Sequence, residues 1–369
     1  MYHLTHLNIH QFRGFRHFHF ENLGRVNLLV GMNNAGKTSV LEALSLYCRS
    51  FDSMEWVATA SRRRMRQPLS LIESLKWFFP QKSQKEDTRG EIQIEAQGHF
   101  EVREIRATFE ELSANPPTMT LATIESEMDF DQDNEELIAG AEIKVLRQLQ
   151  LSENSSHQQE ENFELWENDD KLNRTRKRTL EHTLPVATIM PYSHQIKRVQ
   201  MRQMTHAKTT GFAEQVLHLI QQIDSGIENL EILSNDGKRF SLYFQHRQIG
   251  LAPVNMFGEG LQRSLALVLS LSGMQNGVLL IDELEAGLHT SVLQPVFGLL
   301  VKACRDYNVQ LFATTHSLEA LDAILANVPE DSDEIVVYRL PNPIKGGQLK
   351  RFDGDLLHHL RYERGLDVR

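Results

Sequence analysis

The sequence has few features of a secreted, membrane-bound or disulfide-stabilised protein. Its 369 residues include only two cysteines, Cys48 and Cys304, and no metal-ligand spacing appears around them. No apolar run reaches the roughly 18 residues that a transmembrane helix needs, and the first residues lack the basic and apolar regions of a signal peptide. We therefore expect a cytoplasmic protein with reduced thiols and no membrane partner.

An excess of positive charge is also missing. Lysine and arginine number 39 against 49 aspartate and glutamate residues, a net charge of −10, so a nucleic acid would have to bind a local patch. The dense basic runs are residues 62–66 and 171–178. Such runs more often form a solvated surface, and neither contains interleaved aromatic residues. Nucleic acid therefore stays open as a partner but is not the favoured one.

The strongest motif is a phosphate-binding loop. Residues 31–38 match G-x-x-x-x-G-K-[ST], follow an apolar run at 26–30 and precede a helical pattern, which is the strand, loop and helix context that this motif requires. Lys37 is expected to reach the β- and γ-phosphates of ATP, and the Thr38 hydroxyl to bind Mg²⁺. The remaining predicted ATP contacts come from the same loop: Asn33, Asn34, Ala35, Gly36 and Ser39.

Two later apolar runs end in residues suited to ATP hydrolysis. Residues 278–281 lead directly into Asp282 and Glu283, and residues 309–313 lead towards His316. We expect Asp282 to hold the hydrated Mg²⁺ together with Thr38, and Glu283 to orient and deprotonate the attacking water. His316 is expected to hydrogen-bond the γ-phosphate or that water. Lys37, Glu283 and His316 are thus the predicted catalytic residues.

Alternating strand and helix patterns predict an α/β fold. A hairpin over residues 4–20 should precede the phosphate-binding strand, and the second half should contain strands near 184–190, 278–281, 309–313, 334–338 and 347–352 separated by helices, with a hairpin at 230–244. The expected division is a first ATPase segment at 1–50, an inserted region at 51–183 and a second ATPase segment at 184–369. The insert is expected to hold a helix at 69–79 and a small antiparallel sheet from 91–96, 102–109 and 118–124. An acidic stretch at 125–136, a candidate helix at 137–149 and a polar tract at 152–170 offer few core residues, so the inserted region is expected to be partly mobile.

Together these segments resemble the ATPase head of the RecF, SMC and OLD branch of ABC-type ATPases. Residues 31–38 resemble Walker A, 281–283 Walker B with its catalytic glutamate, 285–289 the D-loop and 314–317 the switch histidine, while 9–15 are similar to the first strand and turn. The likeness covers about 1–50 and 184–340. It implies an ABC-type P-loop NTPase head with a mixed sheet flanked by helices.

The resemblance also implies a signature loop, for which residues 257–263 are the candidate. They lack the serine of the Leu-Ser-Gly-Gly-Gln form but resemble the Gly-x-Gly variants of OLD-like members. Contact with the γ-phosphate held by a second subunit would then fall to backbone amides at Gly258 and Gly260, with Arg263 as a further candidate. By the same analogy Ser193 and Gln195 are candidates for a polar group near Mg²⁺.

By this resemblance, two heads dimerise head to tail around ATP, or assemble further, and hydrolysis opens the dimer. ATP would then act as a switch that regulates a separate effector protein, as in anti-phage defence or genome maintenance. Unlike SMC-like members the insert shows no sustained heptads, and unlike OLD proteins no Toprim motifs follow the ATPase part. Two alternatives stay open: an ATP-gated DNA-binding repair protein of RecF type, and a P-loop phosphotransferase, against which Glu283 argues.

Overall fold

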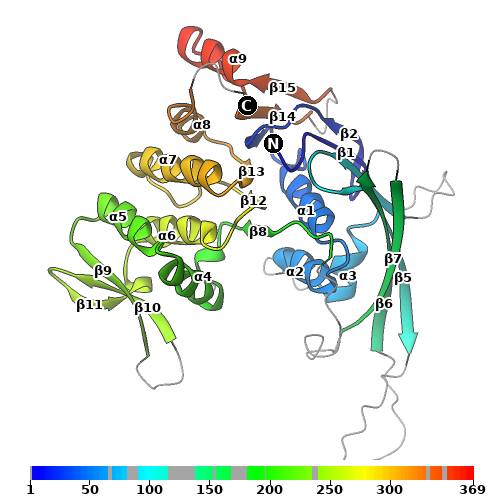
Figure 1. Ribbon diagram of the computed structural model, residues 1–369, viewed down its shortest axis with the longest axis horizontal. Coiled ribbons are helices and arrows are strands. Elements are labelled where there is room, and N and C mark those ends of the chain that lie inside the picture. The colour runs from blue at the N-terminus through cyan, green and yellow to red at the C-terminus, as the bar shows by residue number, and fades with distance from the viewer. Residues whose placement is uncertain are drawn as a thin grey trace, which may run out of the picture.

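The computed structural model describes residues 2–64, 69–80, 90–114, 138–152, 155–167, 181–195, 197–234, 240–329, 333–342 and 347–369. Within these ranges the chain forms three sheets with helices packed between and beside them (Figure 1). None of the described helices is long and apolar enough to cross a membrane.

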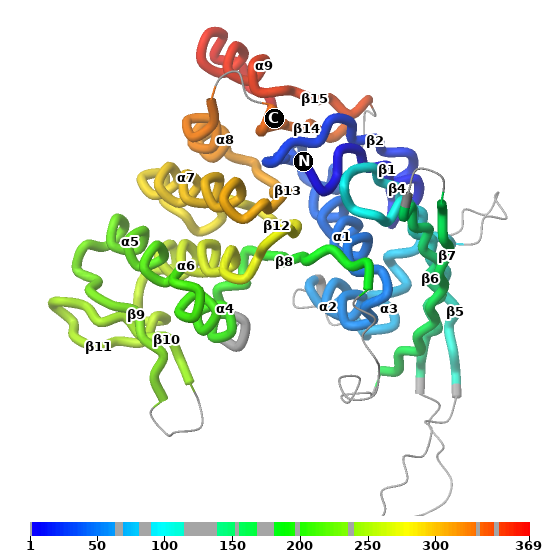
Figure 2. The backbone as a smooth tube through the Cα atoms, viewed as in Figure 1, coloured from blue at the N-terminus to red at the C-terminus, as the bar shows by residue number. Residues whose placement is uncertain are grey.

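The central sheet is a mixed six-stranded sheet in the order β15-β14-β3-β13-β12-β8. Its parallel strands are β3 (Val26–Val30), β8 (Val186–Ile189), β12 (Val278–Ile281), β13 (Gln310–Thr314) and β14 (Ile335–Arg339), and β15 (Lys350–Asp353) is antiparallel. β3 and β14, from opposite ends of the chain, lie side by side (Figure 2). The α/β class with a mixed sheet is thereby confirmed.

Apolar side chains of the central strands alternate between two cores. Leu28 and Ile281 face one core, while Leu29 and Leu280 face the other, as expected for a sheet covered on both faces. The first side is covered by helices α5 (Ala213–Ile223), α6 (Glu259–Leu271), α7 (Thr290–Asp306) and α8 (Leu318–Leu325), with α4 (Lys197–Thr210) beside them.

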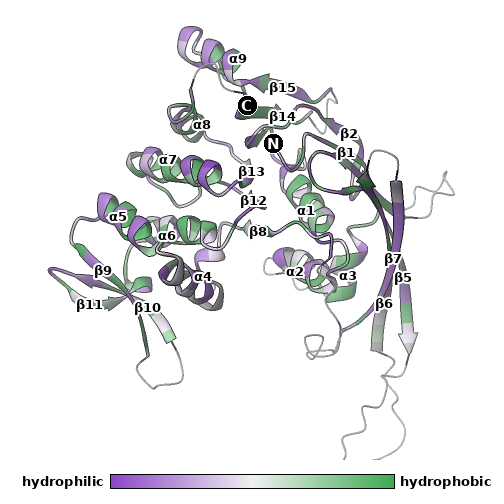
Figure 3. Cartoon of the chain, in the orientation of Figure 1, coloured by the Kyte–Doolittle hydropathy of each residue, from purple (hydrophilic) through white to green (hydrophobic). Residues whose placement is uncertain are grey.

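On the other side lie α1 (Lys37–Cys48), α2 (Ser53–Arg64) and α3 (Leu71–Lys76). α1 is buried along nearly its whole length, because it lies between the central sheet and a second sheet; in Figure 3 much of its ribbon has the colour of hydrophobic residues. The C-terminal part of the chain adds α9 (Gly354–His358), followed by a π-helical turn at His359–Glu363.

The second sheet is antiparallel, in the order β2-β1-β4-β5-β6-β7. Its strands are β1 (His6–Phe12), β2 (Phe15–Phe20), β4 (Glu91–Gln97), β5 (Val102–Ala114), β6 (Ile138–Ser152) and β7 (Ser155–Trp166). β1 pairs with both β2 and β4, so strands from 1–50 and 51–183 share one sheet. The division of the chain at these boundaries stays a prediction.

The inserted region also contains the clearest errors of the sequence interpretation. The helix predicted at 137–149 is strand β6, in which alternate residues from Ala141 to Leu149 are buried. The polar tract at 152–170, in which no strand was predicted, contains β7, a mostly hydrophilic edge strand paired with β6 (Figure 3). The helix predicted at 69–79 is shorter, and α2 and α4 were not predicted. The strand predicted at 118–124 lies outside the described residues.

A small third sheet lies beside α4 and α6. β9 (Ile227–Ser234) and β10 (Phe240–His246) form the predicted hairpin, whose turn at 235–237 is outside the described residues, and β11 (Gly250–Pro253) adds an unpredicted third strand. A 3₁₀ turn at Val254–Met256 then leads into α6. This connection determines where the candidate signature loop lies.

Candidate functional site

The sequence motifs converge on one cavity of about 1130 Å³. It lies at the carboxyl ends of β3, β12 and β13, the usual position of a ligand site in an open α/β sheet. Its lining includes nine of the predicted residues, namely Asn33, Asn34, Gly36, Lys37, Thr38, Ser39, Asp282, Glu283 and His316. Segments that are far apart in the sequence thus contribute to one site.

The loop between β3 and α1 takes conformations that need glycine or asparagine. Gly31 has a φ of 135°, Asn34 one of 65° and Gly36 one of 93°, all in the region that most side chains avoid. A Cβ atom on Gly36 would lie 2.4 Å from the Phe15 ring. The β1–β2 hairpin therefore packs directly on the loop and restricts its conformation.

Lys37 is the buried cation of the site. It is only 7% exposed, and its ammonium donates to the backbone oxygens of Gly31 and Met32 at 2.8 and 3.0 Å. Burial lowers the pKa of Lys37, and the carboxylates of Asp282, Glu285 and Glu283 partly oppose this effect. A buried ammonium that is incompletely balanced in this way would be stabilised by an anion in the cavity.

Thr38 and Asp282 form the candidate metal site. The Thr38 hydroxyl lies 3.1 Å from both carboxylate oxygens of Asp282, which is 5% exposed. Asp282 also accepts a 2.7 Å hydrogen bond from the Thr314 hydroxyl. That hydroxyl in turn accepts one from the backbone N–H of Glu283 at 2.8 Å. Thr314, which the sequence interpretation did not single out, therefore connects the two carboxylate residues.

Hydroxyl and carboxylate oxygens are hard donors of the kind that Mg²⁺ prefers. Among the described residues there is no group of three or more histidine, cysteine, aspartate or glutamate side chains that could hold a metal. A divalent ion at Thr38 and Asp282 would thus need further oxygen ligands from phosphate and water. This is the usual arrangement for Mg²⁺ in nucleotide sites, so the residues fit Mg²⁺ bound together with a nucleotide.

Glu283 has an unusual backbone conformation that Arg263 helps to fix. Its φ of 49° lies in the left-handed region, which a non-glycine residue occupies at an energetic cost and often at functional sites. Arg263, 1% exposed, donates to the backbone oxygens of Met190, Asp282 and Glu283 at 3.0, 3.2 and 2.7 Å. The guanidinium is therefore buried and engaged inside this subunit, which does not support Arg263 as a further candidate for contact with a second subunit.

His316 follows β13 and reaches the cavity from a loop fixed by Glu285. One carboxylate oxygen of Glu285 accepts from the His316 backbone N–H and the other from the Thr315 hydroxyl, both at 2.7 Å. Burial and then the charge of Lys37 lower the pKa of His316, although Glu285, Glu283 and Asp282 oppose this. His316 should thus be mainly neutral at pH 7 and able to accept a hydrogen bond.

The predicted signature residues do not line this cavity. Gly258 precedes α6 and is exposed, with no atom within 4 Å of a Cβ built on it, while a Cβ on Gly260 would lie 3.0 Å from the Gly287 oxygen. Ala35 is likewise absent from the lining. Ser193 accepts a hydrogen bond from the Met190 N–H, and Gln195 lines a separate pocket. Neither residue is among those that line the cavity with Asp282.

The cavity also includes side chains that the sequence interpretation did not assign to it. Arg62, the first residue of one basic run, pairs with Glu55 at 2.8 Å and contributes to the lining. Trp77 lines the cavity as well and is 53% exposed. Arg13 reaches from the β1–β2 turn to Glu42 on α1 at 2.7 Å and to the Trp77 oxygen at 3.2 Å. The basic run at 171–178 lies outside the described residues.

A family model matches residues 26–322, from the phosphate-binding strand to α8. The family is described as "AAA domain, putative AbiEii toxin, Type IV TA system". The chain belongs to this family. Together with the relatives and structures below, the match identifies an ABC-type ATPase of the RecF and SMC branch, as the motifs predicted.

Similar proteins of known sequence agree with this assignment. An "ATP/GTP phosphatase" of Helicobacter pylori is 25% identical over 354 residues, covering 89% of this chain and 88% of the relative. The RecF DNA replication and repair protein of Nitrosococcus oceani is 42% identical over 60 residues, 16% of either chain. The likeness to the phosphatase thus extends over most of both proteins, whereas that to RecF is confined to a segment.

Among solved structures the fold matches that of an SMC head. The structure of an SMC head bound to the C-terminal winged-helix domain of ScpA has a TM-score of 0.52 and 10% identity. It covers 96% of this chain and 98% of that chain. The likeness shows that the two chains share the ABC-type head fold, as predicted for this AAA-domain protein.

Proposed function

We propose that this AAA-domain protein is a cytoplasmic, Mg²⁺-dependent ATP hydrolase that closes as a head-to-tail dimer around ATP and acts as a switch on an effector protein. The observation that carries the proposal is the convergence of Lys37, Thr38, Asp282, Glu283 and His316 on one cavity. Each of these residue types has a task in phosphoryl transfer to water.

The phosphates would lie against the loop at 31–38, with the Lys37 ammonium close to the β- and γ-phosphate oxygens. Bound Mg²⁺ would neutralise charge that develops on those oxygens during the reaction. Thr38 and Asp282 would hold it, and the hydroxyl of Thr314 would fix the orientation of the Asp282 carboxylate.

Glu283 would take a proton from the attacking water as general base. Its backbone is fixed on both sides of the peptide, by Thr314 at the N–H and by Arg263 at the oxygen. A fixed backbone supports the proposed role of Glu283, because a general base acts only within hydrogen-bond reach of the proton that it takes. His316 would hold the γ-phosphate or the same water as a neutral imidazole.

Trp77 would stack on the nucleobase. It is an exposed aromatic side chain in the same cavity as Lys37, and the Arg13 contacts with Glu42 and the Trp77 oxygen link its backbone to α1. Stacking discriminates little between bases, because every base has a π-face. This agrees with the name of the Helicobacter pylori relative, which includes both ATP and GTP.

Dimerisation would bring Gly258 and Gly260 of one subunit onto the γ-phosphate held by the other. The exposed start of α6 has no side-chain cap, and free amides at a helix N-terminus attract anions. Among the described residues, no atom beyond the chain neighbours lies within 4 Å of a Cβ built on Gly258, which leaves room for a partner to approach. A phosphate shared between two surfaces would favour the closed state by differential affinity.

The family description names a putative toxin of a type IV toxin–antitoxin system, which supports a role in a system of that kind. Regulation of a separate effector, as in anti-phage defence, is the part of the proposal that comes from the resemblance to ATPase heads. The RecF segment supports a second candidate, an ATP-gated protein that binds DNA in genome maintenance. This candidate predicts that DNA stimulates ATP hydrolysis. It would be excluded if hydrolysis were unaffected by DNA and if glutamate substitutions in the run at 171–178 changed no DNA binding.

The proposal is tested by measuring ATP affinity and phosphate release for the wild type and for Lys37→Ala. Lys37→Ala should abolish tight ATP binding, because the phosphates lose their buried cation. Wild-type protein should release phosphate from ATP with water as the only acceptor. A phosphotransferase would instead need a second acceptor substrate. Unchanged ATP affinity of Lys37→Ala would contradict the proposed site.

A further inference from the structure

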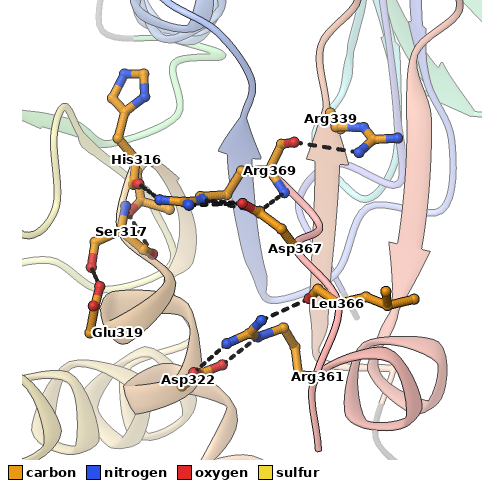
Figure 4. A network of polar contacts seen from close by, with 10 residues as sticks. His316, Ser317, Glu319, Asp322, Arg339, Arg361, Leu366, Asp367 and Arg369 are labelled. Carbon is orange, nitrogen blue, oxygen red and sulfur yellow. Dashed lines mark hydrogen bonds and ion pairs between the residues drawn. The ribbon is translucent and has the colours of Figure 1, made fainter. Parts of the chain in front are cut away.

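The peptide groups of His316 are held from two directions. The N–H donates to Glu285, as described above, and the backbone oxygen accepts a 2.5 Å hydrogen bond from the guanidinium of Arg369 (Figure 4). The first backbone oxygen that accepts a hydrogen bond from within α8 is that of Ser317, so the His316 oxygen lies one residue before the helix. Arg369 therefore fastens the loop itself, just ahead of the helix that follows it.

Arg369 is itself oriented by Asp367. The carboxylate accepts from Nε at 3.0 Å and from the terminal nitrogen at 2.8 Å, which is the two-pronged geometry that orients a guanidinium plane. The hydrogen bonds from Arg369 lower the pKa of Asp367 to about 2, so the carboxylate stays charged at neutral pH. One guanidinium thus connects the Asp367 side chain with the His316 loop.

The segment that carries Arg369 is anchored to α8 at a second point. Arg361 donates two hydrogen bonds, of 2.8 and 2.7 Å, to the carboxylate of Asp322 on α8, and a third to the Leu366 oxygen at 2.7 Å (Figure 4). Val368 is buried in the core on the same side of the sheet. Residues 361–369, here called the strap, are therefore bound to α8 through Arg361 and to the His316 loop through Arg369.

We infer that Arg369 is a positioning residue that holds the backbone of His316 so that the imidazole reaches into the nucleotide cavity. The inference rests on the proposed function, because His316 needs this placement only if the cavity hydrolyses ATP. In Figure 4 the imidazole points away from Arg369, so the guanidinium acts through the peptide group and does not touch the reacting atoms. The strap thereby couples the region of β14, β15 and α9 to the switch histidine.

The test compares Arg369→Ala with Arg364→Ala, an exposed arginine of the same segment. Arg369→Ala should lower kcat for ATP hydrolysis by roughly 5–10-fold while changing ATP affinity less than about twofold, because a misplaced group affects the reacting geometry and not nucleotide binding. Asp367→Asn should give an intermediate loss, because it loosens the guanidinium without removing it. Arg364→Ala should behave as wild type.

A double-mutant cycle separates positioning through His316 from a general structural effect. In a His316→Ala background, Arg369→Ala should cause no further loss of kcat. The inference would be overturned if the kcat of the double variant were lowered by the product of the two single losses, or if Arg369→Ala left kcat unchanged. Either result would leave the proposed ATPase function intact. If instead Lys37→Ala bound and hydrolysed ATP like wild type, the proposed function would fail first and the inference with it.

Discussion

The Thr314 hydroxyl donates a 2.7 Å hydrogen bond to the carboxylate of Asp282. The same oxygen accepts from the Glu283 N–H at 2.8 Å. One buried hydroxyl at the end of β13 thus fixes the orientation of the Asp282 carboxylate, which is proposed to hold Mg²⁺. It also fixes the backbone of Glu283, the proposed general base. Both neighbours follow β12, so the contact also ties the ends of two adjacent strands together.

Thr314→Val keeps the shape of the side chain and removes this hydroxyl. We expect the Mg²⁺ concentration needed for half-maximal hydrolysis to rise by roughly 10–100-fold, the usual effect of losing a partner that orients a metal ligand. Mg²⁺ titrations of ATPase activity measure this. Ser270→Ala, which removes a buried hydroxyl hydrogen bond to Leu267 on α6, is the control and should leave the titration unchanged. Equal Mg²⁺ dependence in Thr314→Val and wild type would refute the assignment.

Trp77 should report nucleotide binding by its own fluorescence, because it lines the cavity and is 53% exposed. The other two tryptophans are not among the lining residues: Trp56 is fully buried and Trp166, on β7, is half-buried. Mg-ATP should change tryptophan emission in the wild type but not in Trp77→Phe, which keeps an aromatic ring. Trp77→Ala should weaken ATP and GTP binding by a similar factor, on the order of 10-fold, and leave tripolyphosphate binding unchanged. An equal loss of tripolyphosphate affinity would place Trp77 outside the base site.

The pH dependence of kcat/KM should reflect the lowered pKa of His316. Burial and Lys37 lower this pKa from its ordinary value near 6.5, so the imidazole stays neutral until the pH falls below that value. Activity should hold between about pH 7 and 8 and fall only on the acid side of 6.5. Since ATP also titrates there, the comparison is with His316→Gln, which should lack this part of the decline. If the acid-side decline of kcat/KM had its midpoint above pH 6.5 and was missing in His316→Gln, the lowered pKa of His316 would be contradicted.

The sequence predicted the parts of the site that depend on local pattern. The loop at 31–38 has a fixed spacing of glycine, lysine and threonine, and β12 and β13 are continuous apolar runs that end in polar residues. Parallel strands buried on both faces have this signature, and their carboxyl ends meet at one edge of a sheet. The convergence of Lys37, Asp282 and His316 could therefore be inferred without coordinates.

Other features depend on contacts that a single sequence does not reveal. In β6, Val145 and Leu149 fit a helical spacing as well as alternation, and only pairing with β5 and β7 decides for a strand. Arg263 lies next to the candidate signature glycines in sequence, yet burial turns its guanidinium inwards. The place of Trp77 in the cavity follows from the packing of α3 against the rest of the molecule, for which the sequence carries no local signal.

The most direct test of the central claim is the mass in solution of Glu283→Gln with ATP and Mg²⁺. Loss of the general base should slow turnover by about 100-fold or more, so ATP should persist and hold two chains of 42.4 kDa together. Gly258→Glu added to this variant should return the protein to a monomer with ATP still bound, because a Cβ at Gly258 has no contact within 4 Å in the described part of its own subunit, beyond its chain neighbours. A Glu283→Gln protein that remains a monomer in Mg-ATP at every concentration would contradict the account.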